Sequence, residues 1–313
     1  MARAGLIADL RDRVTRGRDS DLWYHFTRSP VTVVAAAVTL LFLALAAAAP
    51  VLAPQNPFDA AALNIGDSRL PPVWIDGGML RYPLGTDSQG RDVLSTILYG
   101  SRISLGVSAA ATLFAMLLGV ALGLVSGYLG GRIENLIMRL ADVQLSFPTI
   151  LIALLIDGIA RNALPKNVHQ DLAIPILVLA IGMASWVQYA RTVRGSTLVE
   201  KSKEYVQAAR LIGQPTAHIL FRHILPNVLG PVLVIATLGL GLAILTEATL
   251  SFLGLGVPAT QPSLGTLIRI GNEVLFSGEW WMTIFPGVWL VALVLAVNLL
   301  GDWLRDALNP KLQ

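Results

Sequence analysis

The chain has 313 residues, of which 54% are apolar and only 14% are charged, and its net charge is +3. An average soluble protein has about 25% charged residues, and here the charges lie in short islands between long apolar runs. This distribution excludes a pair of soluble domains and predicts an all-α, polytopic integral membrane protein. The absence of cysteine excludes disulfides and thiolate metal sites.

The N-terminal 30 residues contain six arginines and precede a run, 29–58, that has no formal charge. A secretory signal has an apolar core of only about 7–15 residues, so this run is long enough to be a membrane anchor. We predict a cytoplasmic segment over 1–30 and a first transmembrane helix over 31–53. The alanines at 46–49 before Pro50 would also suit a signal cleavage site, and this alternative stays open.

Residues 54–102 are long for a connection and are predicted to form an extracytoplasmic loop. Thr86 and Asp87 are candidate helix caps. Beyond Asp92 the apolar residues fall on one helical face, which predicts a short amphipathic helix at the membrane surface; an ordinary packed connector is the alternative. Four residues are predicted to form an extracytoplasmic surface motif: Asp87, Gly90, Arg91 and Asp92.

Six segments have the length and apolarity of spanning helices. The third is short unless it is extended back to residue 136. A five-helix core is predicted over 103–300, with a cytoplasmic coupling segment at 190–227 and a cytoplasmic tail at 301–313. The six segments are 32–53, 103–124, 143–156, 172–189, 228–250 and 282–300.

Orientation follows from the lysines and arginines between the spans. If the N-terminus is inside, 16 of the 23 basic residues lie on the inner side and 7 on the outer side. The reverse topology would invert that bias. We therefore place both termini and the segment around residue 204 in the cytoplasm, in the cytoplasmic (inner) membrane of a bacterial cell.

The segment from Glu204 to Pro226 is charged and lies between two apolar runs. Gly213 stands where a helix C-terminus favours a left-handed residue, and Pro215 stands where the next helix favours its first residue. The pattern predicts two short helices joined by a corner. A structured corner of this kind on one side of a membrane indicates a docking site for another protein.

Two polar residues within the spans are hypothetical members of a translocation path. Glu247 interrupts the fifth span, and an ionisable group at depth is a functional candidate by default. The alternative is that it lies near the outer interface and caps or snorkels. Asn298 is the second candidate, for which hydrogen bonding between helices is the alternative. Gly119 and Gly123 form a Gly-x-x-x-Gly pair, which is typical of close helix packing.

Signals for chemistry are weak. No Gly-Lys dipeptide occurs, so the chain has no phosphate-binding P-loop, and any ATP and Mg²⁺ must bind to another chain. His218 and His223 are five residues apart, which does not place two metal ligands on one helical face. The basic residues are not interleaved with aromatic ones, so nucleic acid is not expected as a partner. We predict a non-catalytic chain with no cofactor or metal of its own.

Several segments in this order resemble one family, the permease subunits of bacterial ABC importers of the dipeptide, oligopeptide and nickel group, and in particular their C-type partner. The resemblance covers nearly the whole chain. The segments that carry it are 23–30, 84–92 with 99–105, 204–227, 250–256 and 298–310.

The family's cytoplasmic signature, Glu-Ala-Ala followed by Gly and a Leu-Pro ending, is matched with its spacing intact. The matching residues, with Glu204 and His223 beside them, are Gln207, Ala208, Ala209, Gly213, Leu225 and Pro226. Gln207 departs from the family's Glu and removes one potential ion pair. The resemblance implies the type I ABC importer permease fold, with these residues in a coupling helix that enters a cleft of an ATPase.

The resemblance also implies partners: a second related permease, two ATPase subunits, an extracytoplasmic solute-binding protein and membrane lipid. It implies a substrate delivered by the binding protein, with di- or oligopeptides as the first choice and nickel chelates, glutathione or opines as alternatives. A proton-driven secondary transporter is the rival from another class. The absence of charged pairs at the middle of the spans and of an inverted repeat disfavours it.

Overall fold

The computed structural model describes residues 26–59, 63–258 and 260–307, and this part of the chain is helical apart from loops and one isolated bridge between Thr86 and Asp92. Five of its helices are long and apolar enough to cross a membrane, and a sixth span results if one bent helix pair is counted as one. The predicted all-α, polytopic fold is confirmed. The Arg-rich segment before residue 26 and the tail from 308 to 313 lie outside the described residues.

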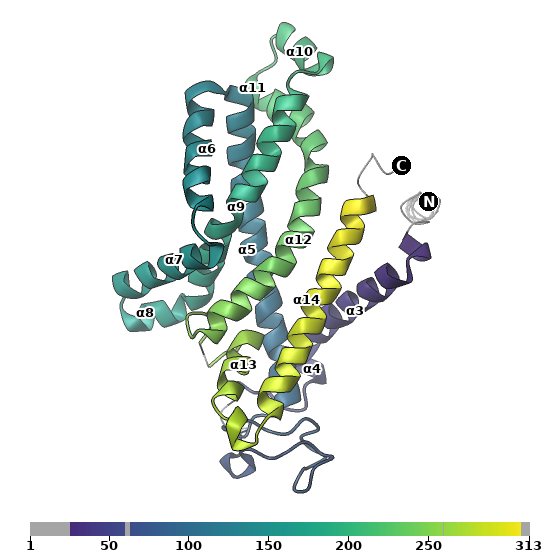
Figure 1. Ribbon diagram of the computed structural model, residues 1–313, viewed down its shortest axis with the longest axis vertical. Coiled ribbons are helices and arrows are strands. Elements are labelled where there is room, and N and C mark those ends of the chain that lie inside the picture. Colours follow the sequence, from purple (N-terminus) through teal and green to yellow (C-terminus); the bar gives the residue numbers. More distant parts are fainter. Residues whose placement is uncertain (1–25, 60–62, 259, 308–313) are drawn as a thin grey trace, which may run out of the picture.

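The long helices pack side by side in a single elongated bundle (Figure 1). Their bounds are α3 (Pro30–Ala47), α4 (Ala49–Leu52), α5 (Val93–Leu129), α6 (Gly131–Leu145), α7 (Thr149–Ala163), α8 (Lys166–Asp171), α9 (Ala173–Glu200), α10 (Glu204–Leu211), α11 (Thr216–His218), a π-helix (Ile219–Ile224), α12 (Leu225–Phe252), α13 (Leu264–Asn272) and α14 (Trp281–Ala307).

The centre of the bundle is the long contact between α5 and α9, which lie side by side in Figure 1. Glycines at 119, 123 and 127 face α9, and a Cβ on Gly123 would lie 2.7 Å from the Ala190 carbonyl oxygen and 2.7 Å from the Val193 Cβ. The two backbones approach so closely that side chains do not fit between them. The Gly-x-x-x-Gly pair therefore packs as the sequence predicts.

The third span differs from the prediction because it is bent. Helices α6 and α7 meet at 96°. Pro148 has no N–H to continue the α6 hydrogen bonds, and a proline also disfavours helical backbone in the residue before it. The predicted segment 143–156 therefore straddles a corner between two 15-residue helices.

The predicted surface helix after Asp92 is wrong as a separate element. Residues 93–98 are the first turns of α5, which continues unbroken for 37 residues. The polar face is buried as deeply as the apolar one, because the Ser95 hydroxyl donates to the Asp92 carboxylate at 2.6 Å and accepts from the Gln55 N–H at 3.1 Å. Satisfied hydrogen bonds allow this face to be buried rather than exposed to water.

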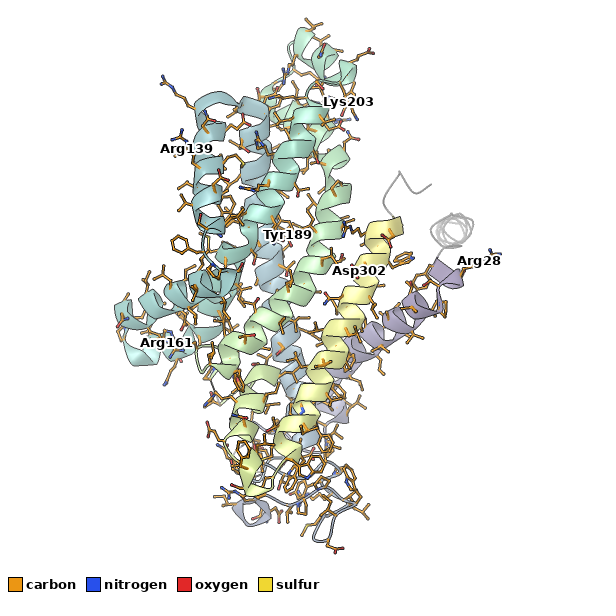
Figure 2. All side chains as sticks on the ribbon, viewed as in Figure 1. Arg28, Arg139, Arg161, Tyr189, Lys203 and Asp302 are labelled. Carbon is orange, nitrogen blue, oxygen red and sulfur yellow. The ribbon has the colours of Figure 1, made fainter. Side chains whose placement is uncertain are left out.

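The two ends of the bundle differ in charge and in chain connections. Helix α10 lies at one end, and Arg139 and Lys203 lie toward it (Figure 2). The start of α3 and the end of α14 are in the same half of the molecule, whereas α13 and the loop before α5 occupy the other end (Figure 1). The positive-inside rule places the α10 end in the cytoplasm.

Candidate functional site

The segment between α9 and α12 has the predicted corner. Gly213 adopts a left-handed φ of 75°, and its N–H donates to the Arg210 carbonyl at 3.0 Å as α10 ends. Pro215 is the N-cap of α11 rather than its first residue, a shift of one position. A π-helix then joins α11 to α12, so helical backbone continues from Thr216 to Phe252.

One face of this segment packs on the bundle. Val206, Ala209, Ile219 and Ile224 are buried in an apolar cluster with residues of α5 and α9. The apolar residues at 206 and 209 recur with helical spacing, so one face of α10 packs against the π-helix at the tip of the bundle. The cluster makes the corner an extension of the α5–α9 core.

A polar network surrounds Tyr205 and joins three elements. The Tyr205 hydroxyl donates to the Glu200 carboxylate at the end of α9, and it accepts from the Asn227 amide of α12 at 3.1 Å. The same Asn227 amide donates to the His223 carbonyl at 2.6 Å. Burial and the hydrogen bond to Glu200 raise the pKa of Tyr205 to about 12, so the phenol stays a donor at neutral pH.

Two cations tie the segment to the end of α5. The Arg210 guanidinium lies 4.7 Å from the centre of the Tyr128 ring. The Lys201 ammonium donates to the Gly127 carbonyl at 2.7 Å. The segment is therefore fixed to the bundle by apolar packing, by hydrogen bonds and by a cation–π contact.

The opposite face of the segment is exposed and partly apolar. Leu211 is 88% exposed, Ile212 is 73% exposed and Phe221 is 67% exposed. These three residues, the apolar tip, were missed by the sequence analysis, although two apolar residues directly before Gly213 in a charged segment are a usable signal. Exposed apolar side chains on a segment that joins two spans are typical of a protein interaction site.

The predicted coupling residues fall into three groups around this tip. Glu204, Gln207, Ala208, Gly213 and Pro226 are exposed, whereas Ala209 is buried. His223 and Leu225 are partly buried. The Gln207 amide donates to the Ser202 carbonyl at 2.9 Å, so it stabilises the start of its own helix. The structure brings all eight together in one compact segment.

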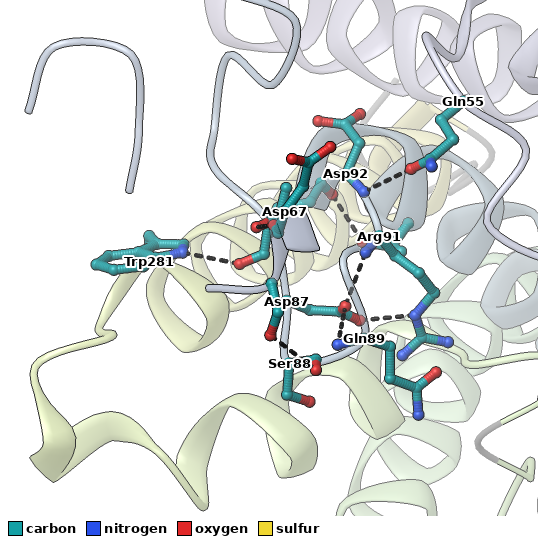
Figure 3. A network of polar contacts seen from close by, with 12 residues as sticks. Gln55, Asp67, Asp87, Ser88, Gln89, Arg91, Asp92 and Trp281 are labelled. Carbon is teal, nitrogen blue, oxygen red and sulfur yellow. Dashed lines mark hydrogen bonds and ion pairs between the residues drawn. The ribbon is translucent and has the colours of Figure 1, made fainter. Parts of the chain in front are cut away.

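The four residues predicted to form an extracytoplasmic surface motif are buried, so the prediction that they lie on the surface is wrong. Asp87, Arg91 and Asp92 are at most 5% exposed. Asp87 accepts from the Arg91 Nε at 2.6 Å and from the Arg91 N–H at 3.0 Å (Figure 3). Gly90 has a φ of 74° and closes this turn.

The same turn is connected to distant parts of the chain. The Trp281 indole donates to the Thr86 carbonyl at 3.2 Å, and the Asp92 N–H donates to the Gln55 side chain at 2.9 Å (Figure 3). Burial raises the pKa of Asp92, although hydrogen bonds from Ser95 oppose that shift. The motif therefore joins the outer loop to the starts of α5 and α14.

Glu247 is fully buried between α12, α5 and the loop before α13. Its carboxylate accepts from the Ser104 hydroxyl at 2.8 Å and from the Ser251 hydroxyl at 2.7 Å. These hydroxyls in turn accept from the N–H groups of Leu264 and Val257 at 3.2 and 3.3 Å. This geometry supports a structural role, and a place in the translocation path stays a prediction.

Asn298 lies at the contact between α14 and α12, where its side chain packs directly against Gly241. It is partly buried, and a path role for it also stays a prediction. Among residues 26–59, 63–258 and 260–307, no group of three or more His, Asp or Glu side chains is arranged to hold a metal ion.

Glu247→Ala is expected to lower the stability of the folded chain by about 2–4 kcal/mol, because it leaves a cavity and two buried hydroxyls without their acceptor. Thermal denaturation in detergent measures this loss. Thr249→Ala is the matched control, since its hydroxyl donates to the Leu245 carbonyl of its own helix. Equal melting temperatures for the two variants would contradict the structural role.

Comparisons with known proteins agree with a transport subunit of this fold. Residues 119–313 match the family described as binding-protein-dependent transport system inner membrane component. Residues 20–72 match the N-terminal TM domain of oligopeptide transport permease C. In inward-facing structures of the MetNI methionine ABC transporter, one chain superposes with a TM-score of 0.52 at 22% identity, covering 69% of this chain and 97% of that one.

Curated relatives extend over almost the whole length. The dipeptide transport system permease protein of Haemophilus influenzae is 38% identical over 94% of this chain and 95% of its own. The glutathione transport system permease protein of Pectobacterium atrosepticum is 38% identical over 97% and 95%. The oligopeptide transport system permease protein of Bacillus subtilis is 34% identical over 94% and 90%.

The helical fold and the family match define a multi-pass membrane subunit of a transport system. The chain belongs to the family of binding-protein-dependent transport system inner membrane components. It is accordingly a non-catalytic, multi-pass inner membrane protein, as the sequence predicts.

Proposed function

We propose that this chain is the permease subunit of an ATP-driven importer of di- or oligopeptides. It pairs with a second, related permease to enclose the translocation path. The coupling segment from Glu204 to Pro226 binds one of two ATPase subunits, and a solute-binding protein delivers the peptide to the opposite face. The observation that carries this proposal is the exposed apolar tip at Leu211, Ile212 and Phe221 on a buried, hydrogen-bonded base.

The contacts beneath the tip support a lever-like role. Helical backbone continues from Thr216 to Phe252, so a displacement of the tip is transmitted along α12. The Glu200–Tyr205–Asn227 contacts tie the same displacement to α9. ATP shifts the equilibrium between inward- and outward-open states by as much as it binds the two states differently.

The peptide substrate class is supported by the relatives, whose names include dipeptide, oligopeptide and glutathione transport permeases. Glutathione is the second candidate, because that relative is as similar to this chain as the dipeptide permease. Nickel chelates and opines remain alternatives from the sequence alone. Family membership opposes the proton-driven rival.

The proposal is tested by assembling the chain with the two ATPases and the second permease in proteoliposomes. We expect peptide uptake that needs ATP and the binding protein, whereas the isolated chain should release phosphate at well below about 1 per second, the low end of ordinary enzyme rates. Phosphate release at that rate by the isolated chain, or uptake driven by a proton gradient without ATP, would contradict the proposal.

Leu211→Glu places a charge on the tip and should reduce co-purification of the ATPases at least about tenfold, a loss of about 1.4 kcal/mol. Arg139→Gln is the control at the same end of the bundle (Figure 2), since Arg139 is exposed on α6. The control should retain the ATPases.

A further inference from the structure

A cavity of about 410 Å³ lies on the side of the bundle, in its outer half and away from the coupling segment. We call it the outer cavity. It is lined by the end of α7, by α8, by the start of α9, and by the turn from Gly254 to Pro258 together with α13, and it is partly open. Its polar lining is basic, with Arg161, His169 and Arg269. Arg161 marks its position in Figure 2.

Arg161 is fixed at the cavity wall. Its Nε donates to the Asp157 carboxylate at 2.6 Å, and its Nη2 donates to the Gly254 carbonyl at 3.2 Å. About two fifths of the side chain stays exposed. The guanidinium is therefore held in one orientation while part of it faces the cavity.

Two buried nitrogen atoms of lining residues have no hydrogen-bond partner within the described part of the chain. The Arg269 Nε is unpaired, although its Nη1 lies 3.2 Å from the exposed Glu273 carboxylate. The His169 Nε2 is also unpaired, at 3.6 Å from the Asp157 Oδ1. Buried polar atoms are normally satisfied, so these two nitrogens mark unused hydrogen-bonding capacity beside the cavity, next to positive charge.

The surroundings exclude contact of the outer cavity with lipid tails. Two arginines cannot face hydrocarbon without a large cost, and the irregular backbone from Gly254 to Pro258 requires either protein or water beside it. The outer cavity therefore opens to water or to a polar ligand. A planar guanidinium with free donors is the group that best fits a carboxylate, because it can offer two parallel N–H bonds.

We propose that the outer cavity binds the C-terminal carboxylate of the transported peptide after it leaves the binding protein, with Arg269 as the principal contact and Arg161 as the second. This inference rests on the proposed peptide importer. A volume of about 410 Å³ is within the range of about 300–1,000 Å³ of small-molecule sites. The binding of a carboxylate would satisfy the Arg269 donor that is otherwise unpaired.

The test compares uptake of a free peptide acid with uptake of the same peptide as its C-terminal amide, in proteoliposomes that contain the full complex. Any preference of the binding protein itself for the peptide acid or the amide is the same for the wild type and for every variant. It therefore cancels when the acid-to-amide ratios of a variant and the wild type are compared. Arg269→Gln is chosen over Arg161→Gln, since Arg269 has an exposed partner and the loss of Arg161 would leave the buried Asp157 uncompensated.

We expect Arg269→Gln to lower the acid-to-amide ratio about tenfold, with uptake of the amide changed less than about twofold. Arg269→Lys keeps the charge and should retain most of the ratio. Arg81→Gln removes a charge from an exposed position in the outer loop and should leave the ratio unchanged.

An unchanged ratio in Arg269→Gln would overturn the proposal. An equal fall for acid and amide would overturn it as well, since that result assigns Arg269 to assembly or to an anionic lipid. If the importer proposal itself is wrong, the result is different: the wild-type complex would take up neither the peptide acid nor the amide with ATP.

Discussion

Gly213→Val is expected to lower peptide uptake at least tenfold while the chain still inserts in the membrane. Gly213 has a φ of 75°, in the left-handed region. A residue with a Cβ is disfavoured there by roughly 1–2 kcal/mol, and a β-branched one by more. The strain should turn the backbone at the corner and displace the apolar tip, whereas the spans are unchanged. Uptake by the reconstituted complex at equal protein amount measures the effect.

Two variants isolate the backbone as the cause. Gly213→Asn should restore most of the uptake, because asparagine tolerates left-handed backbone better than other non-glycine residues. Gly195→Val introduces the same side chain in α9, where nothing lies within 4 Å of the added Cβ and the backbone is helical. Near-wild-type uptake by Gly213→Val would show that the corner tolerates a side chain and would contradict the lever.

Local sequence signals predict this corner well. The positions of Gly213 and Pro215 are properties of neighbouring residues, so the sequence predicts the corner to within one position. The same holds for the long apolar spans, five of which the structure contains as single helices. The glycines at 119 and 123 indicate close packing of α5, because such spacing is typical of it, but they do not identify α9 as the partner.

The outer motif could not be placed from sequence, because its partners are remote. Asp92 is held by Gln55, 37 residues away, and the Thr86 carbonyl by Trp281, 195 residues away. An amphipathic pattern after Asp92 predicts a surface helix only if its polar face meets water. Here the polar face meets other polar groups of the protein. The pattern therefore predicted the helix correctly, but not that its polar face is buried.

The same reason applies to Glu247. A carboxylate within a span signals either a path or a buried network, and only the position of Ser104, 143 residues earlier, separates the two. The outer cavity is the opposite case, in which the structure reveals a candidate site that the sequence does not indicate. Arg161 and Arg269 are unremarkable loop-side charges in the sequence, and they become a candidate site only because α7, bent at Pro148, lies against the turn after α12.

At the α5–α9 contact, an added side chain is expected to cost about as much stability as the loss of the Glu247 side chain. A Cβ on Gly119 would lie 2.5 Å from the Trp186 carbonyl oxygen, and one on Gly123 would lie 2.7 Å from the Ala190 carbonyl oxygen. Real Cβ atoms essentially never approach other heavy atoms closer than 3.0 Å. The obstructing atoms are backbone atoms of α9 together with the Cβ atoms of Tyr189 and Val193. A Cβ atom cannot move without its backbone, so relief requires the two helices to move apart.

Gly123→Val is therefore expected to lower the stability of the chain by about 3 kcal/mol, which is the upper part of the range for overpacked cores. Replacing both Gly119 and Gly123 by valine should give little folded protein. Loss of monodisperse protein on heating in detergent measures this. Gly106→Val is the control in the same helix, because nothing lies within 4 Å of a Cβ there. A Gly123→Val chain as stable as Gly106→Val would show that α5 and α9 do not pack backbone to backbone. Because the coupling segment extends this same contact, loss of uptake should accompany the loss of stability in Gly123→Val.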